Sequence, residues 1–458
     1  MADPVILWFR RDLRLADQAA LLAACAQGPV IPVYVLDDET PRHRRMGAAS
    51  RWWLHHSLAS LDADLRKRGS RLILRRGKVE DVLTALAADT AAASIHALHH
   101  YEPWWRNAEA AIGKRVPLTL HDGNYLSPPG VLRTGGGQPY RIFTPFWRAL
   151  REIMPPPGPA AAPQVIPAPV SWPHSDRLED WALLPTAPDW ADGFAAEWTP
   201  GETGALGRLD DFVDRPSAYD EARNLPSIEG CSRLSAHLHF GEISPATIWH
   251  RFDDPQRKAD AYLRELAWRD YAQTVILQLP DYGRVNGRAQ LDALAWRDLN
   301  DAKGDFAAWK SGKTGYPIVD AGMRQLWATG WMHNRVRMIA ASFLIKHLLI
   351  DWRHGEQWFW DTLVDADYGN NAVNWQWVAG SGVDSNMFVR IMAPLSQSEK
   401  FDAGDYIRRW VPELAHLRGP AVHDPDAFGC RPKDYPTKII EHRAGRERAL
   451  AAFATLNG

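Results

Sequence analysis

Residues 5–36 read VILWFRRDLRLADQAALLAACAQGPVIPVYVL. Two apolar runs in it, Val5–Phe9 and Val30–Leu36, have the length of buried strands, and Asp17–Gln27 between them has a helical pattern. A strand, a helix and a second strand in succession predict two parallel strands of one sheet, because parallel neighbours need a crossover connection. The start of the chain is therefore predicted to be an α/β fold.

The same alternation continues along the chain. A helix at Ala48–Arg68 is followed by a strand at Arg71–Arg75, and a helix at Val79–Ala88 by strands at Ser94–Leu98 and Val116–Leu120. Strands alternating with helices predict a doubly wound parallel sheet that is covered on both faces. Ligands of such folds bind at the carboxyl ends of the strands.

The pattern changes at Met154–Pro173, MPPPGPAAAPQVIPAPVSWP. Proline lacks the backbone donor and fixes φ, so this segment is predicted to be an extended connector. Beyond about residue 200 the helical period dominates, at Ala259–Leu279, Ile318–Thr329, Trp331–Leu349 and Gly355–Leu363. We predict an α/β domain at 1–130, a linker at 131–200 and an all-α domain at 201–458.

Composition limits the possible classes of protein. At 458 residues, 46% hydrophobic and 24% charged, the chain is expected to be globular, with two or more domains. It has no uncharged apolar run of about 18 residues and no signal-peptide layout, so no membrane partner is expected. Cys25, Cys231 and Cys430 form no CxxC pair, which favours a reducing cytoplasm and no metal site. With a net charge of −2, nucleic acid would need a local basic surface.

Two glycine patterns resemble nucleotide motifs only in part. Gly312–Tyr316 reads GKTGY, but a P-loop needs glycine where Ala307 stands, and a strand where Phe306–Lys310 has a helical pattern. No GxGxxG follows the first strand, as a Rossmann site would require. The run Gly135–Gly137 is predicted to be a hairpin turn.

Asp365–Trp377, DADYGNNAVNWQW, combines three unusual features. Two acidic residues and two tryptophans are each separated by one residue, with an asparagine-rich segment between the pairs. Asn and Gly favour an irregular backbone here, and Asp and Asn can bind the polar edges of a planar ligand. The chain carries 22 tryptophans. These features predict an aromatic ligand surrounded by redox-capable indoles.

Three other segments carry side chains suited to binding. In Ala261–Tyr271, Tyr262, Glu265 and the pair Trp268 and Arg269 share one helical face; a salt-bridged surface with a core tryptophan explains such a set equally well. In GWMHNRVRM (330–338), Asn334 lies beside arginines suited to phosphate, although methionine usually packs in cores. In EGCSRLS (229–235), a turn before a helix can bind an anion or simply cap the helix.

These segments occur in one order with GKTGYPIVDAGMRQL and with the start LWFRRDLRLADQAAL. The series closely resembles the photolyase/cryptochrome family over nearly the whole chain, nearest to the class I-like cyclobutane pyrimidine dimer photolyases of bacteria. The resemblance implies an α/β domain that can hold an antenna pigment, and an all-α FAD-binding catalytic domain.

The resemblance also implies roles for individual residues. FAD would be held by Tyr219, Cys231, Ser232, Arg233, Leu234, Ser235, Tyr262, Arg269, Arg337, Asp365, Asp367 and Asn371. The family usually has Thr or Ser where Cys231 stands, and a thiol is a weak donor. Asn371 would lie opposite the reactive nitrogen of the flavin ring. Electrons would reach the flavin through Trp375, Trp352 and Trp296.

A flipped-out pyrimidine dimer in damaged DNA would contact a further set of residues. These are Glu265, Trp268, Asn334, Arg335, Met338 and Trp377, with Arg223 and Arg390 near flanking phosphates. Enzymes of the family that act on the (6-4) photoproduct carry a His pair in the helix, whereas here His333 precedes Asn334. The implied activity is light-driven DNA repair. A blue-light photoreceptor of the cryptochrome type and a (6-4) photolyase are the alternatives.

A second chromophore is expected near Met46 and Glu102. The candidates are methenyltetrahydrofolate and 8-hydroxy-5-deazaflavin, with FMN as a further option. His239 stands where some deazaflavin binders have lysine, which disfavours that pigment. A monomer is expected.

Overall fold

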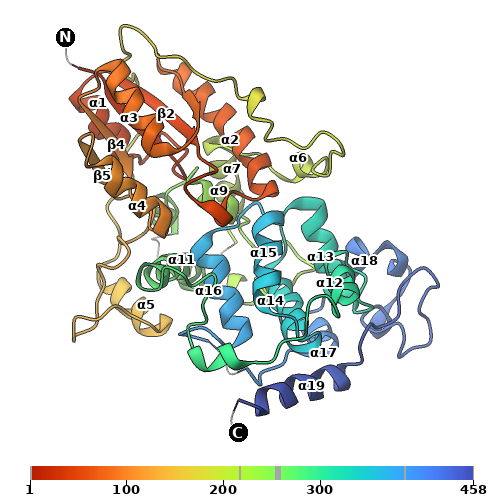
Figure 1. Cartoon of the computed structure of the whole chain (residues 1–458). Helices are drawn as coiled ribbons and strands as arrows, with labels where there is room; N and C mark the ends of the chain where they lie inside the picture. Colours follow the sequence, from red (N-terminus) through yellow and green to blue (C-terminus); the bar gives the residue numbers. More distant parts are fainter. Residues whose placement is uncertain (1–2, 216–217, 253–258, 386–387, 457–458) are drawn as a thin grey trace. The chain divides into compact units, whose positions relative to one another are not determined.

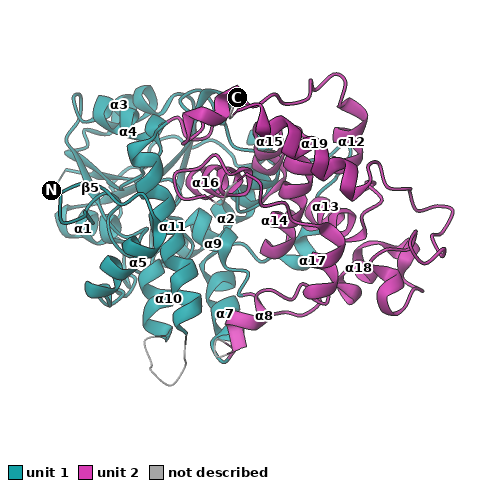
Figure 2. Cartoon of the chain, turned by 90° about the horizontal axis from the view of Figure 1, so that it is seen from below, with its two compact units in different colours: residues 1–214, 232–280, 364–367 teal, residues 215–231, 281–363, 368–458 magenta. Residues whose placement is uncertain are grey.

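The chain forms two compact units, which Figure 2 colours separately. The computed structural model describes residues 3–215, 218–252, 259–385 and 388–456. Unit 1 comprises residues 1–214, 232–280 and 364–367, and unit 2 comprises 215–231, 281–363 and 368–458. Both units combine segments that are distant in sequence. The domain limits at 130 and 200 stay predictions.

Unit 1 contains a five-stranded parallel sheet (Figure 1). Its order is β3-β2-β1-β4-β5, with every neighbouring pair parallel. The strands are β1 (Val5–Phe9), β2 (Val30–Leu36), β3 (Ile73–Arg76), β4 (Ser94–Leu98) and β5 (Leu118–His121). The α/β prediction is thus confirmed, and three strands have the predicted limits. The other two begin two residues later than predicted.

Helices cover this sheet. They are α1 (Ala19–Gln27), α2 (Ala48–Arg66), α3 (Val79–Thr90) and α4 (Pro103–Ile112). Ile6 and Trp8 of β1 pack in one apolar layer with Leu83 of α3 and Ile112 of α4, whereas α1 packs against β1 and β4. All five residues of β1 are buried, so this strand is covered on both faces of the sheet.

The proline-rich segment is extended and attached to the α/β part of unit 1. The backbone N–H of Asp17 donates to the carbonyl of Ala160 at 2.7 Å, and that of Val30 donates to Pro167 at 2.7 Å. Ile166 is 1% exposed. Two helices flank this segment, α5 (Phe143–Glu152) and the single turn α6 (Phe194–Glu197). The connector therefore runs along the domain rather than standing free in solvent.

The rest of the described chain is helical. Unit 1 adds α7 (Glu202–Phe212), α9 (Ser235–Phe240), α10 (Pro245–Phe252) and α11 (Asp260–Gln278). The described helices of unit 2 are α8 (Tyr219–Ala222), α12 (Lys303–Lys310), α13 (Pro317–Thr329), α14 (Asn334–Ser342), α15 (Trp352–Thr362), α16 (Tyr368–Ala379), α17 (Pro394–Lys400), α18 (Gly404–Trp410) and α19 (His442–Ala454). The mostly helical second part was predicted correctly.

The irregular backbone predicted for Asp365–Trp377 is wrong beyond its first residues. From Tyr368 the segment is α16. Ala372, Val373 and Trp375 are all buried there, so packing overrides the weak helix preference of asparagine and glycine. Asn374 donates from its own side chain to the carbonyl of Asn370, four residues earlier.

The single helix predicted at Trp331–Leu349 also begins and ends differently. The side chain of His333 accepts a hydrogen bond from the N–H of Arg335 and caps the start of α14. After Ser342 the backbone changes to one π-helical turn, Phe343–His347, so the regular helix is shorter than the apolar pattern.

The GKTGY segment of unit 2 closes on the helix that follows it. Asp320 accepts hydrogen bonds from the N–H and Oγ1 of Thr314, both at 2.7 Å, and from the N–H of Gly315 at 3.0 Å. The element before the segment is helix α12. The segment therefore binds its own carboxylate instead of cradling a phosphate. The glycines at 135–137 form the predicted turn, with Arg133 bridged to Pro139.

Candidate functional site

A polar group in unit 1 surrounds the start of α9. Oγ of Ser235 donates to Oδ2 of Asp365 at 2.7 Å. Arg233, two residues earlier, has a φ of 55°, which is uncommon for a residue with a Cβ atom. Its guanidinium donates to the carboxylate of Glu197 at 2.9 Å and lies 4.6 Å from the ring centroid of Trp198. The segment before α9 is irregular, as predicted, and the acidic partner Glu197 already compensates the charge of Arg233. Anion binding by this segment stays a prediction.

A chain of charged side chains in unit 1 ends at Asp367. Arg11 lies 2.6 Å from Glu102 and 3.7 Å from Asp367. Gln273 donates from Nε2 to both carboxylate oxygens of Asp367, each at 3.2 Å. Burial acts to raise the pKa of Glu102, but Arg11 and His100 outweigh it and hold that pKa below its usual range. Glu102 is therefore ionised, and Arg11 links it to Asp367.

The four residues predicted to share one face of α11 separate into two environments. Tyr262 is 5% exposed and packs on Phe212, with ring centroids 4.8 Å apart. Arg269 donates to the backbone carbonyls of Asn124 and Leu238, at 2.6 and 3.0 Å. Both side chains are thus engaged inside unit 1. A ring cluster therefore surrounds Tyr262, whereas backbone oxygens hold Arg269.

Glu265 and Trp268 are the partly exposed members of the set. The indole of Trp268 meets Phe143 edge to face, with centroids 4.2 Å apart, and Tyr271 at 5.2 Å. These contacts fix the orientation of the indole while leaving part of it accessible. The pair can therefore present an aromatic face beside a carboxylate.

Asp270 of α11 is 1% exposed and accepts a hydrogen bond from the N–H of Ser127 at 3.1 Å. Burial raises the pKa of Asp270 to about 7. Because the folded pKa lies above the unfolded one, its contribution to stability is complete below pH 4 and is lost as the pH rises to 7. The free energy of unfolding should fall by about 1.4 kcal/mol per pH unit in that window from this group.

We expect Asp270→Asn to remove that slope, as checked by urea-unfolding midpoints from pH 4 to 8. An unchanged slope would contradict the assignment.

In unit 2, Asn371 of α16 is held by Glu356 of α15. Nδ2 of Asn371 donates to the carbonyl of Glu356 at 3.0 Å and to its Oε1 at 2.9 Å. Both partners are acceptors, so the orientation of the amide is fixed by this network. Oδ1 of Asn371 has no hydrogen-bond donor among the described residues. It remains an acceptor for a donor from outside the chain.

The two tryptophans of α16 lie on different sides of the helix. Trp375 is 3% exposed and packs edge to face on Phe359 and Trp309, at 5.0 and 6.4 Å. Trp377, two residues later, is partly exposed. Two positions correspond to about 200° around a helix, so one indole faces the core and the other faces away from it.

Trp352 and Trp296 lie in separate surroundings within unit 2. Trp352 is 0% exposed, and its indole N–H donates to Oδ1 of Asn286 at 3.0 Å. Trp296 is partly exposed and lies 6.5 Å from the ring of Phe388. Across the described residues, no ring contact joins any two of Trp375, Trp352 and Trp296. Trp375 and Trp352 are buried and Trp296 is partly exposed, and the electron relay stays a prediction.

The start of α14 presents polar side chains in unit 2. Asn334 is exposed, and Arg335 donates to Oδ1 of Asn224 and lies 4.3 Å from the ring centroid of Phe401. Met338 is in contact with Arg335. Burial, and then Arg335 and other arginines, lower the pKa of His333 to about 4. His333 is therefore neutral near pH 7, consistent with its role as a helix cap.

The other predicted residues of unit 2 are placed as follows. Tyr219 is 8% exposed, and the guanidinium of Arg223 lies 5.7 Å from its ring. Arg337 donates to the carbonyl of Met332 at 2.7 Å. Arg390 is exposed and Cys231 partly exposed.

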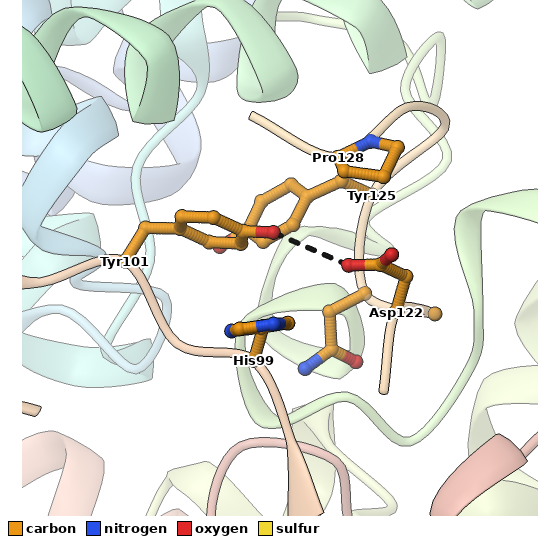
Figure 3. Close-up of a pocket in the computed structure, with 7 residues that line it drawn as sticks. His99, Tyr101, Asp122, Tyr125 and Pro128 are labelled. Carbon is orange, nitrogen blue, oxygen red and sulfur yellow. Dashed lines mark hydrogen bonds between the residues drawn. The ribbon is translucent and has the colours of Figure 1, made fainter. Parts of the chain in front are cut away.

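The predicted antenna residues of unit 1, Met46 and Glu102, do not line the described pocket near the ends of β4 and β5. Glu102 is 1% exposed and bound to Arg11. Figure 3 shows a pocket next to the ends of β4 and β5, where Tyr101 donates to Asp122 at 3.3 Å. Its cavity volume is about 10 Å³, against about 300–1,000 Å³ for pockets that enclose whole ligands. Met46 lies elsewhere, with its carbonyl bound by Arg51.

Sequence reasoning missed four residues that organise these groups. Arg11, Gln273, Asn286 and Glu356 are polar and buried or nearly buried. A signal existed for Arg11, because it follows the end of β1, where α/β folds bind ligands. Glu356 and Gln273 stand at buried positions of helices, where a polar side chain usually has a specific partner.

No helix in the described ranges is both long and apolar enough to cross a membrane. In the same ranges, no three His, Cys, Asp or Glu side chains are grouped so as to hold a metal ion.

Comparisons with known proteins cover almost the whole chain. The family model described as DNA photolyase matches residues 5–165, and that described as FAD binding domain of DNA photolyase matches 262–455. A deoxyribodipyrimidine photo-lyase of Agrobacterium fabrum is 49% identical, over 99% of this chain and 98% of the relative. Cryptochrome-2 of Arabidopsis thaliana is 34% identical, over 93% of this chain and 73% of the relative.

Solved structures of other proteins have a similar fold over the whole chain. A bacterial class III photolyase from Agrobacterium tumefaciens has a TM-score of 0.95 and 47% identity, covering 100% of this chain and 98% of the other. An archaeal photolyase from Sulfolobus tokodaii with two FAD molecules has a TM-score of 0.84 and 29% identity, covering 99% and 100%. The class I-like grouping expected from the motifs stays a prediction. By both family models and by its relatives, this chain belongs to the DNA photolyase family.

Proposed function

We propose that this protein repairs cyclobutane pyrimidine dimers in DNA in a light-dependent reaction, as a deoxyribodipyrimidine photo-lyase. The observation that carries the proposal is the 49% identity, across both units, to a relative of that name. The partly exposed Glu265 and Trp268 of α11 support it, because they offer a carboxylate and an aromatic face to a base.

FAD can donate hydrogen bonds to two acceptor oxygens that have no donor within the described chain. Oδ1 of Asn371 and the buried Oε1 of Gln273 both lack a donor among the described residues. The residues proposed to hold FAD are those that the family resemblance implies: Tyr219, Cys231, Ser232, Arg233, Leu234, Ser235, Tyr262, Arg269, Arg337, Asp365, Asp367 and Asn371. When bound and reduced, FAD supplies the light-excited electron that splits the cyclobutane ring.

The chain positions and shields the reacting groups. Asn371 can accept a hydrogen bond from a ring N–H without adding a charge, because Glu356 turns its NH₂ group away. Gln273 and Arg11 fix the carboxylate of Asp367. Trp268 and Trp377 supply apolar faces for a flipped lesion, while Glu265 and Asn334 meet its polar edges. Arg223, Arg335 and Arg390 take flanking phosphates, and Met338 supports Arg335.

Ser235→Ala tests the FAD assignment. The change removes the 2.7 Å hydrogen bond that fixes Asp365. One exposed hydrogen bond contributes about 0.5–1.5 kcal/mol, so we expect FAD to bind roughly two- to tenfold more weakly. Fluorescence titration of the flavin-free protein with FAD measures the change. As the control, Ser311→Ala alters an exposed serine that bonds only to the backbone of its own helix. Equal affinity for wild type and Ser235→Ala would contradict the role.

The remaining assignments are finer proposals. Trp375, Trp352 and Trp296 pass electrons to oxidised FAD. A second chromophore binds to the α/β part of unit 1; the archaeal relative with two FAD molecules supports a second site in the family. Methenyltetrahydrofolate, 8-hydroxy-5-deazaflavin and FMN are distinguished by mass spectrometry of released pigment. The protein is proposed to act as a monomer in the cytoplasm, where its separate thiols stay reduced.

Dimer-containing DNA tests the proposed function directly. The purified protein, with FAD reduced, is incubated with such DNA under blue light and in darkness. Loss of dimers only in light supports repair, and no light-dependent loss would contradict it. Loss of the (6-4) photoproduct alone would favour the other repair activity. Flavin photoreduction without any repair would favour a photoreceptor.

A further inference from the structure

The indole N–H of Trp352 begins a short polar chain in unit 2. It donates to Oδ1 of Asn286 at 3.0 Å, and Nδ2 of Asn286 donates to Oδ1 of Asp292 at 2.6 Å. An indole only donates and a carboxylate only accepts, so the amide can take one orientation. Trp352 and Asn286 are 0% and 6% exposed, whereas Asp292 is exposed. The chain therefore connects a buried indole to a surface carboxylate.

The other two tryptophans of the proposed relay lack this feature. In the described part of the chain, the indole N–H groups of Trp375 and Trp296 make no hydrogen bond. Trp375 is surrounded by the rings of Phe359 and Trp309. The indole N–H of Trp375 thus has aromatic neighbours but no polar acceptor among the described residues. At Trp352 a polarised acceptor already faces the atom that becomes acidic on oxidation.

Other neighbours of Trp352 disfavour a positive charge on its indole. Trp352 is the first residue of α15, so the positive end of the helix dipole lies beside it. The guanidinium of Arg353 lies 4.9 Å from its ring centroid, and Asp351 compensates only part of that charge from 2.9 Å. Without Asn286 and Asp292, the start of α15 and the guanidinium of Arg353 would together disfavour a positive charge on the indole.

We propose that Asn286 and Asp292 are positioning residues that stabilise the radical cation of Trp352 during photoreduction of FAD. This inference rests on the relay in the proposed function. Trp375 gives one electron to light-excited, oxidised FAD and becomes a radical cation. Trp352 then gives one electron to Trp375, which returns to the neutral indole, and the positive charge moves to Trp352. The N–H of Trp352 becomes a stronger donor to Asn286, which the charge of Asp292 polarises. Return of the electron is thereby slowed.

Asp292→Asn separates charge from hydrogen bonding. The new side chain can still accept from Nδ2 of Asn286, but it carries no charge. We expect the yield of flavin photoreduction to fall by about three- to tenfold, because a charge-assisted hydrogen bond is roughly twice as strong as the neutral one that remains. Transient absorption should show a shorter-lived tryptophan radical. Asn286→Leu removes the acceptor itself and should lower the yield further. Asp298→Asn is the matched control, because Asp298 is exposed and its side chain bonds only to the N–H of Asn300.

Repair by chemically reduced protein distinguishes this inference from the proposed function. Repair then needs no relay, so Asp292→Asn should split dimers at the wild-type rate. Equal photoreduction yield and radical lifetime in wild type and Asp292→Asn would overturn the role of the pair. So would a parallel loss of repair in that variant, since it would indicate a structural defect. Absence of repair in the wild type itself would instead contradict the proposed function.

Discussion

Trp268→Ala should lower light-dependent dimer repair by about 10- to 100-fold, because stacking of one base on an aromatic side chain contributes about 1–3 kcal/mol. The indole is held edge to face on Phe143 at 4.2 Å, so it is ordered before DNA binds and loses little entropy on stacking. The measurement is the initial rate of dimer loss at low DNA concentration, under constant blue light, with FAD chemically reduced beforehand.

Three controls separate stacking from other effects of the change. Trp268→Phe keeps a smaller aromatic face and should recover part of the rate. Trp327→Ala removes a tryptophan that is 51% exposed and proposed for no site, and it should repair like the wild type. Flavin photoreduction should be unchanged in Trp268→Ala, because Trp268 is not among the tryptophans of the proposed relay. Wild-type repair by Trp268→Ala would contradict the lesion role and strengthen the photoreceptor alternative.

The sheet could be predicted because its signal is local. Val5–Phe9, Val30–Leu36 and Ser94–Leu98 are continuous apolar runs, as expected for parallel strands buried on both faces, and their limits were predicted to the residue. The segment Asp365–Trp377 was harder, because asparagine and glycine carry a local preference against helix. Burial of Trp375 and its neighbours decides its conformation, and this burial depends on residues far away in the sequence.

In the candidate site, too, contacts between residues that are distant in sequence could not be predicted from local patterns. The helical repeat determines which side chains of one helix share a face. The sequence spacing was therefore enough to group Tyr262, Glu265, Trp268 and Arg269 on α11. The spacing could not show that Phe212 and its neighbours enclose Tyr262 while Trp268 stays partly accessible. Arg11 and Asp367 are 356 positions apart in sequence and 3.7 Å apart in the structure. Nothing in the local pattern of either residue names the other as its partner.

Gly355→Ala should displace Trp375 and destabilise unit 2. A Cβ atom at Gly355 would lie 2.2 Å from Cη2 of Trp375 and 2.6 Å from Cδ2 of Leu344. Both neighbours are buried, so neither can move without loss of packing. Overpacking of this kind costs about 1–3 kcal/mol. The expected results are a lower unfolding midpoint and a lower yield of flavin photoreduction, because Trp375, the proposed first electron donor, is displaced. Urea unfolding and absorbance changes under blue light measure the two effects.

Gly304→Ala is the matched control for this change. Gly304 lies in α12, also in unit 2, and a Cβ atom there would meet nothing within 4 Å. Alanine favours helix over glycine by about 0.5–1 kcal/mol, so this variant should be slightly more stable and should photoreduce normally. The two substitutions are chemically identical, so opposite effects on stability would isolate the contact with Trp375. Equal stability and equal photoreduction in both variants would contradict the predicted displacement of Trp375.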